Sequence, residues 1–508
     1  MRFYQLRGKE NSFKYILIIL TLIISSCGIM KKEEQEEIIL ARVGDKTVSL
    51  NEFIRRAEYT VRPQYCNGDN NIHKKIILNS LIAEKMLALE AGETNELVQN
   101  KAFQNYIKGR QEQAMREWLL HEEGFQKVRL EESEIRKVYD VAGRTYNVQY
   151  IQIPDDSIAG IVKKELHNNE RLFEAIHQQL LGEDDIPERE VSWKSKEHLM
   201  IHEALFSNSL TKGQIVGPLR IDEDFHIVMK ILGWTDKLAV TESDQQQRWN
   251  DVKEKLTEKR AMENYNKYVG EIMVGKKLEF DQNTFYKMVK LISPLYMRSP
   301  EEKRDLFLKN AFNRDKENPE LHDLGVGIGE LLDNSFFRVE DRVWSVRDFK
   351  EELQRHPLVF RKKIQKKSDF AEQFKLAIVD MVRDRYMTQE AYKRGYQHVN
   401  VVKRYTQMWH DALLALHQKY QYLEERIPNL SDSLNSVAVI EEYLNPYIDE
   451  LQEKYSDRVE VNVQQFNDIH LTRIDMFVTQ QNVPFPVMVP AFPLVTTDYK
   501  LDYGKRIE

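Results

Sequence analysis

Apolar and polar positions alternate in two short stretches that lie far apart in the chain. ARVGDKTVSLNEF (residues 41–53) recurs as FRVEDRVWSVRDF (residues 337–349), at a constant offset of 296. The alternation predicts a strand that turns at an acidic residue and returns into a helix. A serine stands at each helix start with an acidic residue three positions on, which predicts a capping box. These residues are Ser49 with Glu52, and Ser345 with Asp348.

A longer segment with helical spacing of its apolar residues also occurs twice, at an offset of 300. It reads IILNSLIAEKMLALEA (76–91) and LAIVDMVRDRYMTQEA (376–391). A charged helix is expected after each copy, at 97–123 and 398–424. Both halves also close with a helix, a short extended LE or VE segment and a further helix. Three matches in the same order indicate that a helical module is duplicated.

An extra block at 129–238 distinguishes the first half from the second. Its alternating and apolar runs predict strands, and the segments between them predict helices. Strands and helices that alternate on this scale favour a compact α+β domain of about 100 residues inserted into the helical module. The expected strands are 146–153, 190–194, 214–221 and 225–234, and the expected helices lie near 158–167, 170–181 and 196–207. A long returning helix is expected to begin with a capping box of Thr241 and Asp244.

The C-terminal stretch PFPVMVPAFPLVTTDY (484–499) alternates prolines with large apolar residues. Proline at this density excludes a helix and predicts an extended chain. Two interpretations remain open: a tail that packs across the body and covers apolar surface, or a peptide-like segment that occupies a client groove or binds a partner.

The N-terminal residues predict a signal peptide for export. A basic segment precedes the apolar run YILIILTLII, which is about ten residues long and too short to span a bilayer comfortably. It ends in Ile24-Ser25-Ser26-Cys27, which resembles a bacterial lipobox and predicts lipidation of Cys27. The alternative is an ordinary signal sequence with an incidental cysteine. If Cys27 carries lipid, Cys66 has no partner for a disulfide, since the chain has two cysteines.

Chain length and net charge limit the number of domains and the classes of partner that can be expected. A chain of 508 residues with 42% apolar residues is long enough for several domains with real cores. Its net charge of −7 argues against nucleic acid as a partner, because no basic surplus is available to displace counterions. The expected organisation is a signal peptide (1–26), a charged tether (27–37), a first helical module (38–128), the inserted block (129–238), a return helix and module end (239–290), a linker (291–333), a second module (334–470) and the tail (471–508).

This organisation resembles the SurA/PrsA group of exported chaperones, in which a helical module resumes after a parvulin-type prolyl isomerase domain. The resemblance rests on ARVGDKTVSLNEF, on LIAEKMLALEA and on ALFSNSLTKGQIVGPLRIDEDFHIVMKI (204–231). It implies a mainly α fold with α+β: duplicated SurA-type helical modules and a parvulin-like domain inserted in the first copy. It also implies an ATP-independent chaperone for unfolded outer-membrane or secreted polypeptides. We expect no cofactor, no metal, and neither nucleotide nor nucleic acid as a partner. The membrane would be reached through the N-terminal lipid, most simply at the outer membrane facing the periplasm, with the cell surface as the alternative.

Parvulins place two histidines, a hydroxyl group and an apolar pocket around the proline, and most of these positions differ here. His226 keeps the place of the second histidine, whereas Tyr150 replaces the first. Loss of the pair predicts that His226 is a structural residue, hydrogen-bonded to Tyr150 across the sheet, and that isomerase activity is weak or absent. The positions that the resemblance assigns to the peptide pocket are Leu199, Phe206, Ile221 and Phe225.

Two other functions remain as alternatives. The chain could be an active prolyl isomerase in spite of Tyr150, or a structural lipoprotein with one fixed partner in an envelope assembly. A zinc site is not expected, because His198 and His202 stand four apart on a predicted helix without an apparent third ligand.

Overall fold

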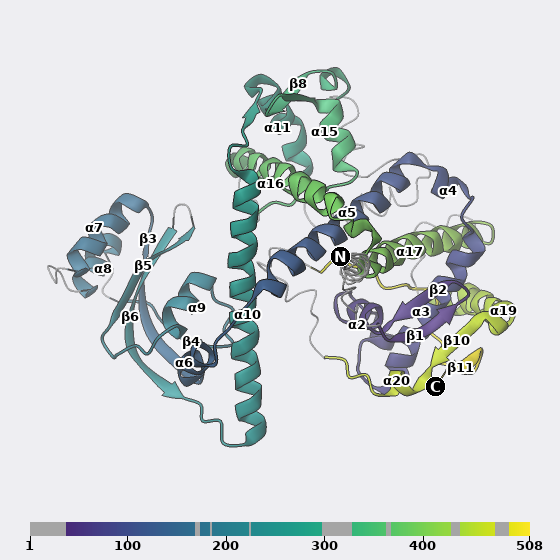
Figure 1. The fold of residues 1–508 in the computed structure, drawn as a ribbon, viewed down its shortest axis with the longest axis horizontal. Coiled ribbons are helices and arrows are strands. Elements are labelled where there is room, and N and C mark those ends of the chain that lie inside the picture. The colour runs from purple at the N-terminus through teal and green to yellow at the C-terminus, as the bar shows by residue number, and fades with distance from the viewer. Residues whose placement is uncertain are drawn as a thin grey trace, which may run out of the picture. The chain divides into compact units, whose positions relative to one another are not determined.

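A computed structural model describes residues 37–167, 173–182, 185–222, 225–296, 328–361, 367–427, 437–472 and 487–507. The expected signal peptide with Cys27, most of the expected tether and most of the expected linker lie outside these ranges. The described chain is mainly helical with small, largely antiparallel sheets (Figure 1). The expected class, mainly α with α+β, is therefore confirmed at this level.

The chain divides into two compact units that do not coincide with its two sequence halves. The first unit combines parts of 1–108 and 404–508, and the second combines parts of 109–299 and 320–403. Each unit thus combines segments from the N-terminal and the C-terminal half of the chain.

The elements of the first unit are two opening strands with their helices and a closing group from the C-terminal part of the chain. They are β1 (Ile39–Val43), β2 (Lys46–Ser49), α2 (Leu50–Glu58), α3 (Asn71–Ala91), α4 (Glu96–Gln99), most of α17 (Asn400–Glu424), α18 (Val437–Val439), α19 (Asn445–Tyr455), β10 (Val459–Asn462), α20 (Val463–Asn467) and β11 (Lys505–Ile507).

The second unit contains the inserted block and the opening elements of the second repeat. Its elements are most of α5 (Lys101–Glu123), α6 (Glu132–Ala142), β3 (Arg144–Ile153), α7 (Asp156–His167), α8 (Phe173–Leu181), β4 (Glu188–Ser192), α9 (Leu199–Phe206), β5 (Ile215–Asp222), β6 (Phe225–Asp236), α10 (Glu242–Met273), β7 (Leu278–Phe280), α11 (Gln282–Tyr296), β8 (Ser335–Val339), β9 (Arg342–Ser345), α15 (Val346–Leu353) and α16 (Lys367–Lys393). The predicted strands and the long helix at 398–424 are confirmed to within a few residues, whereas the helix predicted at 97–123 is divided at the extended Asn100 into α4 and α5.

Two sheets, one in each unit, pair strands from opposite halves of the chain in the same register. In the first unit the order is β11-β10-β1-β2, with Arg42 opposite Glu460. In the second the order is β7-β8-β9, with Arg338 opposite Glu279. The arginines are 296 positions apart and the glutamates 181, and both offsets hold for the flanking pairs.

The two hairpin turns also make corresponding backbone hydrogen bonds to the neighbouring strand segment. Gly44 N–H donates to the Arg458 carbonyl at 2.9 Å, and Glu340 N–H donates to the Lys277 carbonyl at 3.2 Å. Both turn residues have positive φ, of 64° and 52°. Glycine adopts this conformation without a Cβ penalty, whereas at Glu340 the side chain has to be accommodated.

The capping residues at the two equivalent helix starts behave differently. Ser345 and Asp348 form the complete predicted box, and so do Thr241 and Asp244 at the start of α10. Ser49 accepts from the Glu52 N–H at 3.1 Å, but the Glu52 carboxylate accepts instead from Lys85 Nζ at 2.9 Å. The predicted box at α2 is therefore half-formed, because a buried lysine competes for its carboxylate.

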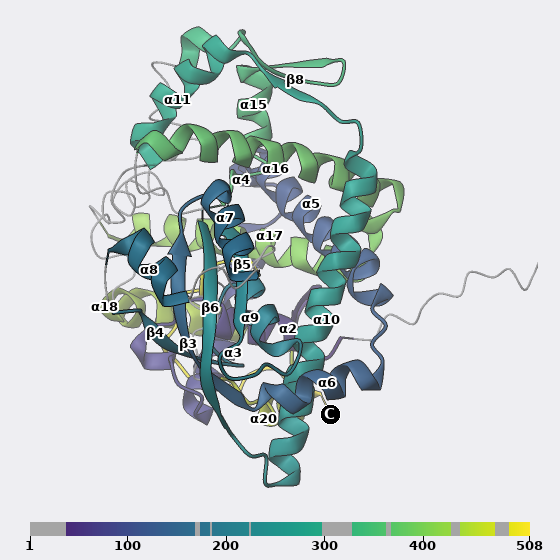
Figure 2. The same ribbon diagram turned by 90° about the vertical axis from the view of Figure 1, so that its left-hand side faces the viewer.

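The inserted block folds around a four-stranded antiparallel sheet of order β4-β3-β6-β5 (Figure 2). One face packs with α9 around Tyr146, Phe206 and Met229, and the other packs with α7 and α8 around Ile151 and Val228. Each face has its own apolar core because successive residues of a strand point to opposite sides.

Candidate functional site

His226 lies near the start of β6 and is 5% exposed. It stands opposite Ile153 of β3, so its side chain belongs to the face that α7 covers. Its Nε2 lies 3.0 Å from Oδ1 of Asp156, the first residue of α7, whose side chain is 63% exposed. The Nδ1 atom is buried and has no hydrogen-bond partner within the described ranges. The histidine therefore fixes the start of α7 against the sheet.

Tyr150 lies on the opposite face of the sheet from His226. It pairs with Met229 in register and packs against the α9-side core, and the guanidinium of Arg189 lies 5.0 Å from its ring centroid. The predicted hydrogen bond between Tyr150 and His226 was wrong. Side chains alternate between the faces of a strand, so residues three positions out of register point in opposite directions.

The four residues expected to form a peptide pocket do not gather on one surface. Phe206 is 1% exposed and fills the core between α9 and the sheet, and Ile221 of β5 packs against the same core. Phe225 is half-buried opposite Asp222. Leu199 is 53% exposed at the start of α9, next to Met200 at 41%. Of the four, Leu199 has its side chain most open to solvent.

His202 and His198 make contacts that hold α9 in place. Burial lowers the pKa of His202 to about 4, its Nε2 lies 3.1 Å from the Trp193 carbonyl, and its ring lies against Trp193 and Phe206. The His198 ring accepts from the Met200 N–H at 3.3 Å, at the N-cap of the helix. Within the described part of the chain no group of three His, Cys, Asp or Glu side chains could hold a metal.

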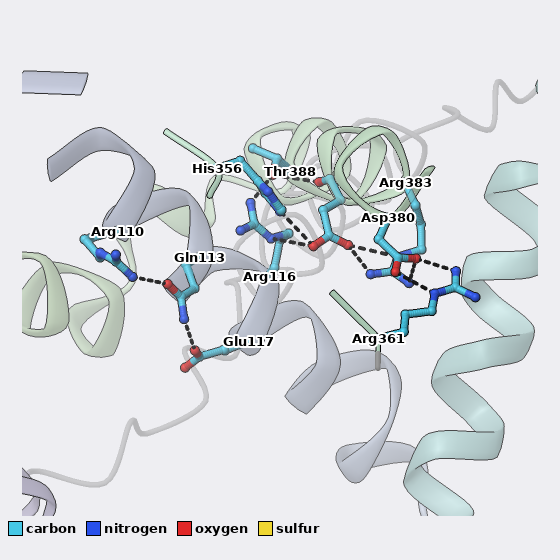
Figure 3. Close-up of polar contacts among 10 residues, drawn as sticks. Arg110, Gln113, Arg116, Glu117, His356, Arg361, Asp380, Arg383 and Thr388 are labelled. Atoms are coloured by element: carbon cyan, nitrogen blue, oxygen red, sulfur yellow. Dashed lines mark hydrogen bonds and ion pairs between the residues drawn. The ribbon is translucent and has the colours of Figure 1, made fainter. Parts of the chain in front are cut away.

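A polar cluster in the second unit includes His356, Arg116 and Arg383 (Figure 3), and these three side chains surround Asp384 of α16. His356 Nε2 lies 3.0 Å from its carboxylate, Arg383 Nη2 donates to it at 2.6 Å, and Arg116 of α5 lies 3.8 Å away. Burial alone would raise the pKa of Asp384, but the His356 hydrogen bond and the two guanidinium charges outweigh it and lower that pKa. The aspartate is therefore held in its ionised form, and its contacts connect α16 with Arg116 of α5 and with His356, which follows α15.

A second polar arrangement, in the first unit, holds the extended C-terminal segment that the sequence predicted, but the side chains that hold it were not predicted. Residues 487–504 form neither helix nor strand. Side chains from other parts of the first unit donate hydrogen bonds to backbone carbonyl groups of this segment. Tyr405 Oη donates to Met488 O at 2.6 Å, Arg56 Nη2 to Ala491 O at 2.8 Å, Lys419 Nζ to Leu494 O at 2.8 Å and Asn79 Nδ2 to Asp498 O at 2.8 Å.

These donors, with Asn445, define what we call the tail groove. Asn445 accepts from the Thr497 N–H at 3.1 Å and from the Thr496 hydroxyl at 2.9 Å. Arg56 and Asn79 are fully buried, and Lys419 is 2% exposed. The groove residues are scattered over the sequence, and the signal that could have led to them was the proline-rich segment that they hold.

None of the described helices is long and apolar enough to cross a membrane. Comparisons with protein-family models, with curated proteins and with solved structures give no match.

Proposed function

We propose that this chain is an ATP-independent chaperone of the cell envelope that binds unfolded or extended polypeptides from an N-terminal lipid anchor on Cys27. Its two helical modules derive from a duplication of a SurA-type module, and the block at 129–238 is a parvulin-like domain inserted in the first copy. The partners are outer-membrane or secreted chains before they fold.

The observation that carries the proposal is the common register of the two module sheets. Arg42 opposite Glu460 and Arg338 opposite Glu279 occupy equivalent positions, and the strand pairs on either side keep the same offsets. If the two sequence segments were similar only by chance, we would not expect their hairpins to pair in the same register with strands from the other half of the chain. The inserted block follows the expected order of an opening strand, two helices, a middle strand, a helix and two final strands.

Exposed apolar side chains supply the contacts that such a chaperone needs. Leu199 and Met200 stand at the start of α9, at a position where the resemblance places a peptide-contacting residue. Weak contacts of this kind exchange readily and shield the unpaired strand edges of a client from aggregation.

The test is suppression of aggregation. An unfolded β-barrel outer-membrane protein is diluted from urea with and without the chain, and light scattering is followed without ATP. We expect the chain to suppress scattering at near-stoichiometric amounts. Leu199→Ser with Met200→Ser should weaken the effect, whereas Val274→Ser, at a residue 79% exposed between α10 and β7, should not. Equal scattering with and without the wild-type chain would reject the proposal.

The two alternatives have separate tests. Cis/trans exchange of a proline peptide, measured by NMR, should show no enhancement at catalytic protein levels; enhancement that His226→Ala abolishes would establish an isomerase. A pull-down should recover a mixed population of β-barrel precursors, whereas one stoichiometric partner would indicate a structural lipoprotein. Cys27→Ser should move the protein from the membrane to the soluble fraction.

A further inference from the structure

Three of the four carbonyl groups that the tail-groove donors contact are spaced by three residues, and the fourth, that of Asp498, lies four residues after Leu494. Those of Met488, Ala491 and Leu494 accept hydrogen bonds from side chains of the first unit. A polyproline II chain has three residues per turn and no internal hydrogen bonds, so carbonyls spaced by three lie along one side of it. The donors of the tail groove are thus arranged for a chain with this repeat.

The side chains of the segment follow the same repeat. Pro490 and Pro493 are buried three positions apart, in a P-x-x-P arrangement, and Phe492 and Val495 are 5% and 3% exposed. Proline-rich segments bind well in grooves because their extended form is already favoured before binding. The ligand class that fits the groove is therefore an extended, apolar polypeptide with P-x-x-P spacing.

Side chains that donate hydrogen bonds to main-chain carbonyls recognise a backbone conformation, and they do not depend on a particular sequence. Arg56 is held in place by the Glu84 carboxylate at 3.0 and 2.6 Å, so its guanidinium is oriented for the Ala491 carbonyl by a partner within the body. A different polypeptide with the same conformation and apolar side chains can meet the same donors.

The groove is not a general requirement of the repeated module. The position 300 residues after the groove donor Asn79 is Val379, so the second copy has an apolar side chain there, and Phe374 lies on the same helix, α16. Phe374 is fully buried in an aromatic core made by described residues of the second unit. Equivalent helices therefore build a core from aromatic residues in one unit and line a groove for an extended segment in the other.

We propose that the tail groove is a binding site for extended, proline-containing apolar polypeptides, and that residues 487–501 occupy it as an internal ligand that a client displaces. This inference rests on the proposed chaperone function and names the class of polypeptide that the first unit takes. The strand pairing of β11 with β10, where Lys505 stands opposite Glu460, holds the end of the tail while the preceding segment exchanges.

The experiment uses the full chain in detergent and a fluorescein-labelled peptide with the sequence of residues 487–501. Binding is followed by fluorescence anisotropy. Phe492→Asp weakens docking of the internal segment, so the peptide should bind this variant at least about tenfold more tightly than the wild type, because apparent affinity scales with the open fraction. Asp502→Asn, at an exposed tail residue outside 487–501, should behave as the wild type. A peptide with alanine at both P-x-x-P prolines should bind weakly.

A Phe492→Asp variant that unfolds cooperatively yet binds no peptide would overturn the inference. If the variant does not unfold cooperatively, added peptide should restore a cooperative transition, and failure to do so overturns the inference as well. The outcome is separable from that of the chaperone test. Suppression of aggregation by the wild type without peptide binding to the variant rejects the groove alone, and peptide binding without suppression rejects the chaperone proposal alone.

Discussion

Arg56 of α2 and Glu84 of α3 form a two-bond ion pair in the interior of the first unit, with Nη1–Oε1 at 3.0 Å and Nη2–Oε2 at 2.6 Å. The Arg56 side chain is fully buried and that of Glu84 is 2% exposed. The neighbouring Lys85 reaches Glu52 at 2.9 Å and Asp411 of α17 at 3.2 Å. An acid-base dipeptide on α3 thus ties together helices from both ends of the chain.

The same dipeptide type recurs 300 positions later as Asp384-Arg385 on α16. Asp384 contacts His356, and Arg385 contacts Glu352 of α15 at 3.3 Å. In α3 and in α16 the acid-base dipeptide therefore contacts residues in or just after the short helix that follows the hairpin, although the partners differ in kind.

Removal of the Glu84 charge should destabilise the first unit strongly. Glu84→Gln leaves the buried Arg56 guanidinium without its counter-charge, and breaking a buried pair in this way costs about 3–5 kcal/mol. The free energy of unfolding is measured by urea denaturation. Glu132→Gln is the matched control, because its pair with Arg136 is 74% and 66% exposed, and such pairs contribute about 1 kcal/mol or less. Equal effects of the two substitutions would contradict the assignment.

Acid should destabilise the inserted domain through His202. Burial lowers the pKa of His202 from 6.5 to about 4, so between these values the unfolded chain binds a proton that the folded chain does not. Stability is therefore fully present above pH 6.5 and falls as the pH drops toward 4, by at most about 1.4 kcal/mol per pH unit. Urea unfolding at pH 7, 5.5 and 4.5 should show this loss relative to His202→Leu. Parallel pH curves for the two proteins would show that the histidine is not the cause.

The Cys66 thiol should be unreactive in the folded protein. The side chain is fully buried in the core of the first unit, and this burial raises the pKa of the thiol to about 12. The thiolate is the reactive form, so a thiol reagent meets very little of it at pH 8. In a Cys27→Ser protein the remaining thiol should react with a chromogenic disulfide only after denaturant is added. Rapid reaction without denaturant would place Cys66 at an accessible surface.

Local features of the fold followed from the sequence, and pairings between distant segments did not. The hairpins, the block strands and the caps at Ser345 and Thr241 depend on residues within a few positions of one another, and they formed as predicted. The half-formed cap at Ser49 departs from prediction because Lys85, distant in sequence, takes the Glu52 carboxylate.

The pairing of β1 with β10 and of β8 with β7 could not be predicted, since β7 and β10 suit either hairpin equally well by pattern. The same holds within the candidate site. The strand positions of Tyr150 and His226 were predicted correctly, but their relative register decides which face each occupies, and a shift of one residue reverses it. The donors of the tail groove come from α2, α3 and α17, and no local pattern marks them as a set.

Lys419 should make the stability of the first unit rise with pH. Burial lowers its pKa from 10.5 to about 8, and its ammonium donates to the Leu494 carbonyl in the tail groove. Between these pH values the unfolded chain holds a proton that the folded chain has released. The free energy of unfolding of the wild type should therefore increase from pH 8 toward 10.5 relative to Lys419→Met, by up to about 1.4 kcal/mol per pH unit. Below pH 8 the lysine is protonated in both the folded and the unfolded state. The difference in free energy of unfolding between the wild type and Lys419→Met should therefore be constant there. Urea denaturation at pH 7, 8, 9 and 10 distinguishes these regimes. A difference that stays constant from pH 7 to 10 would mean that the buried amine is solvated in the folded protein, and that the carbonyl it meets in the tail is held by other contacts.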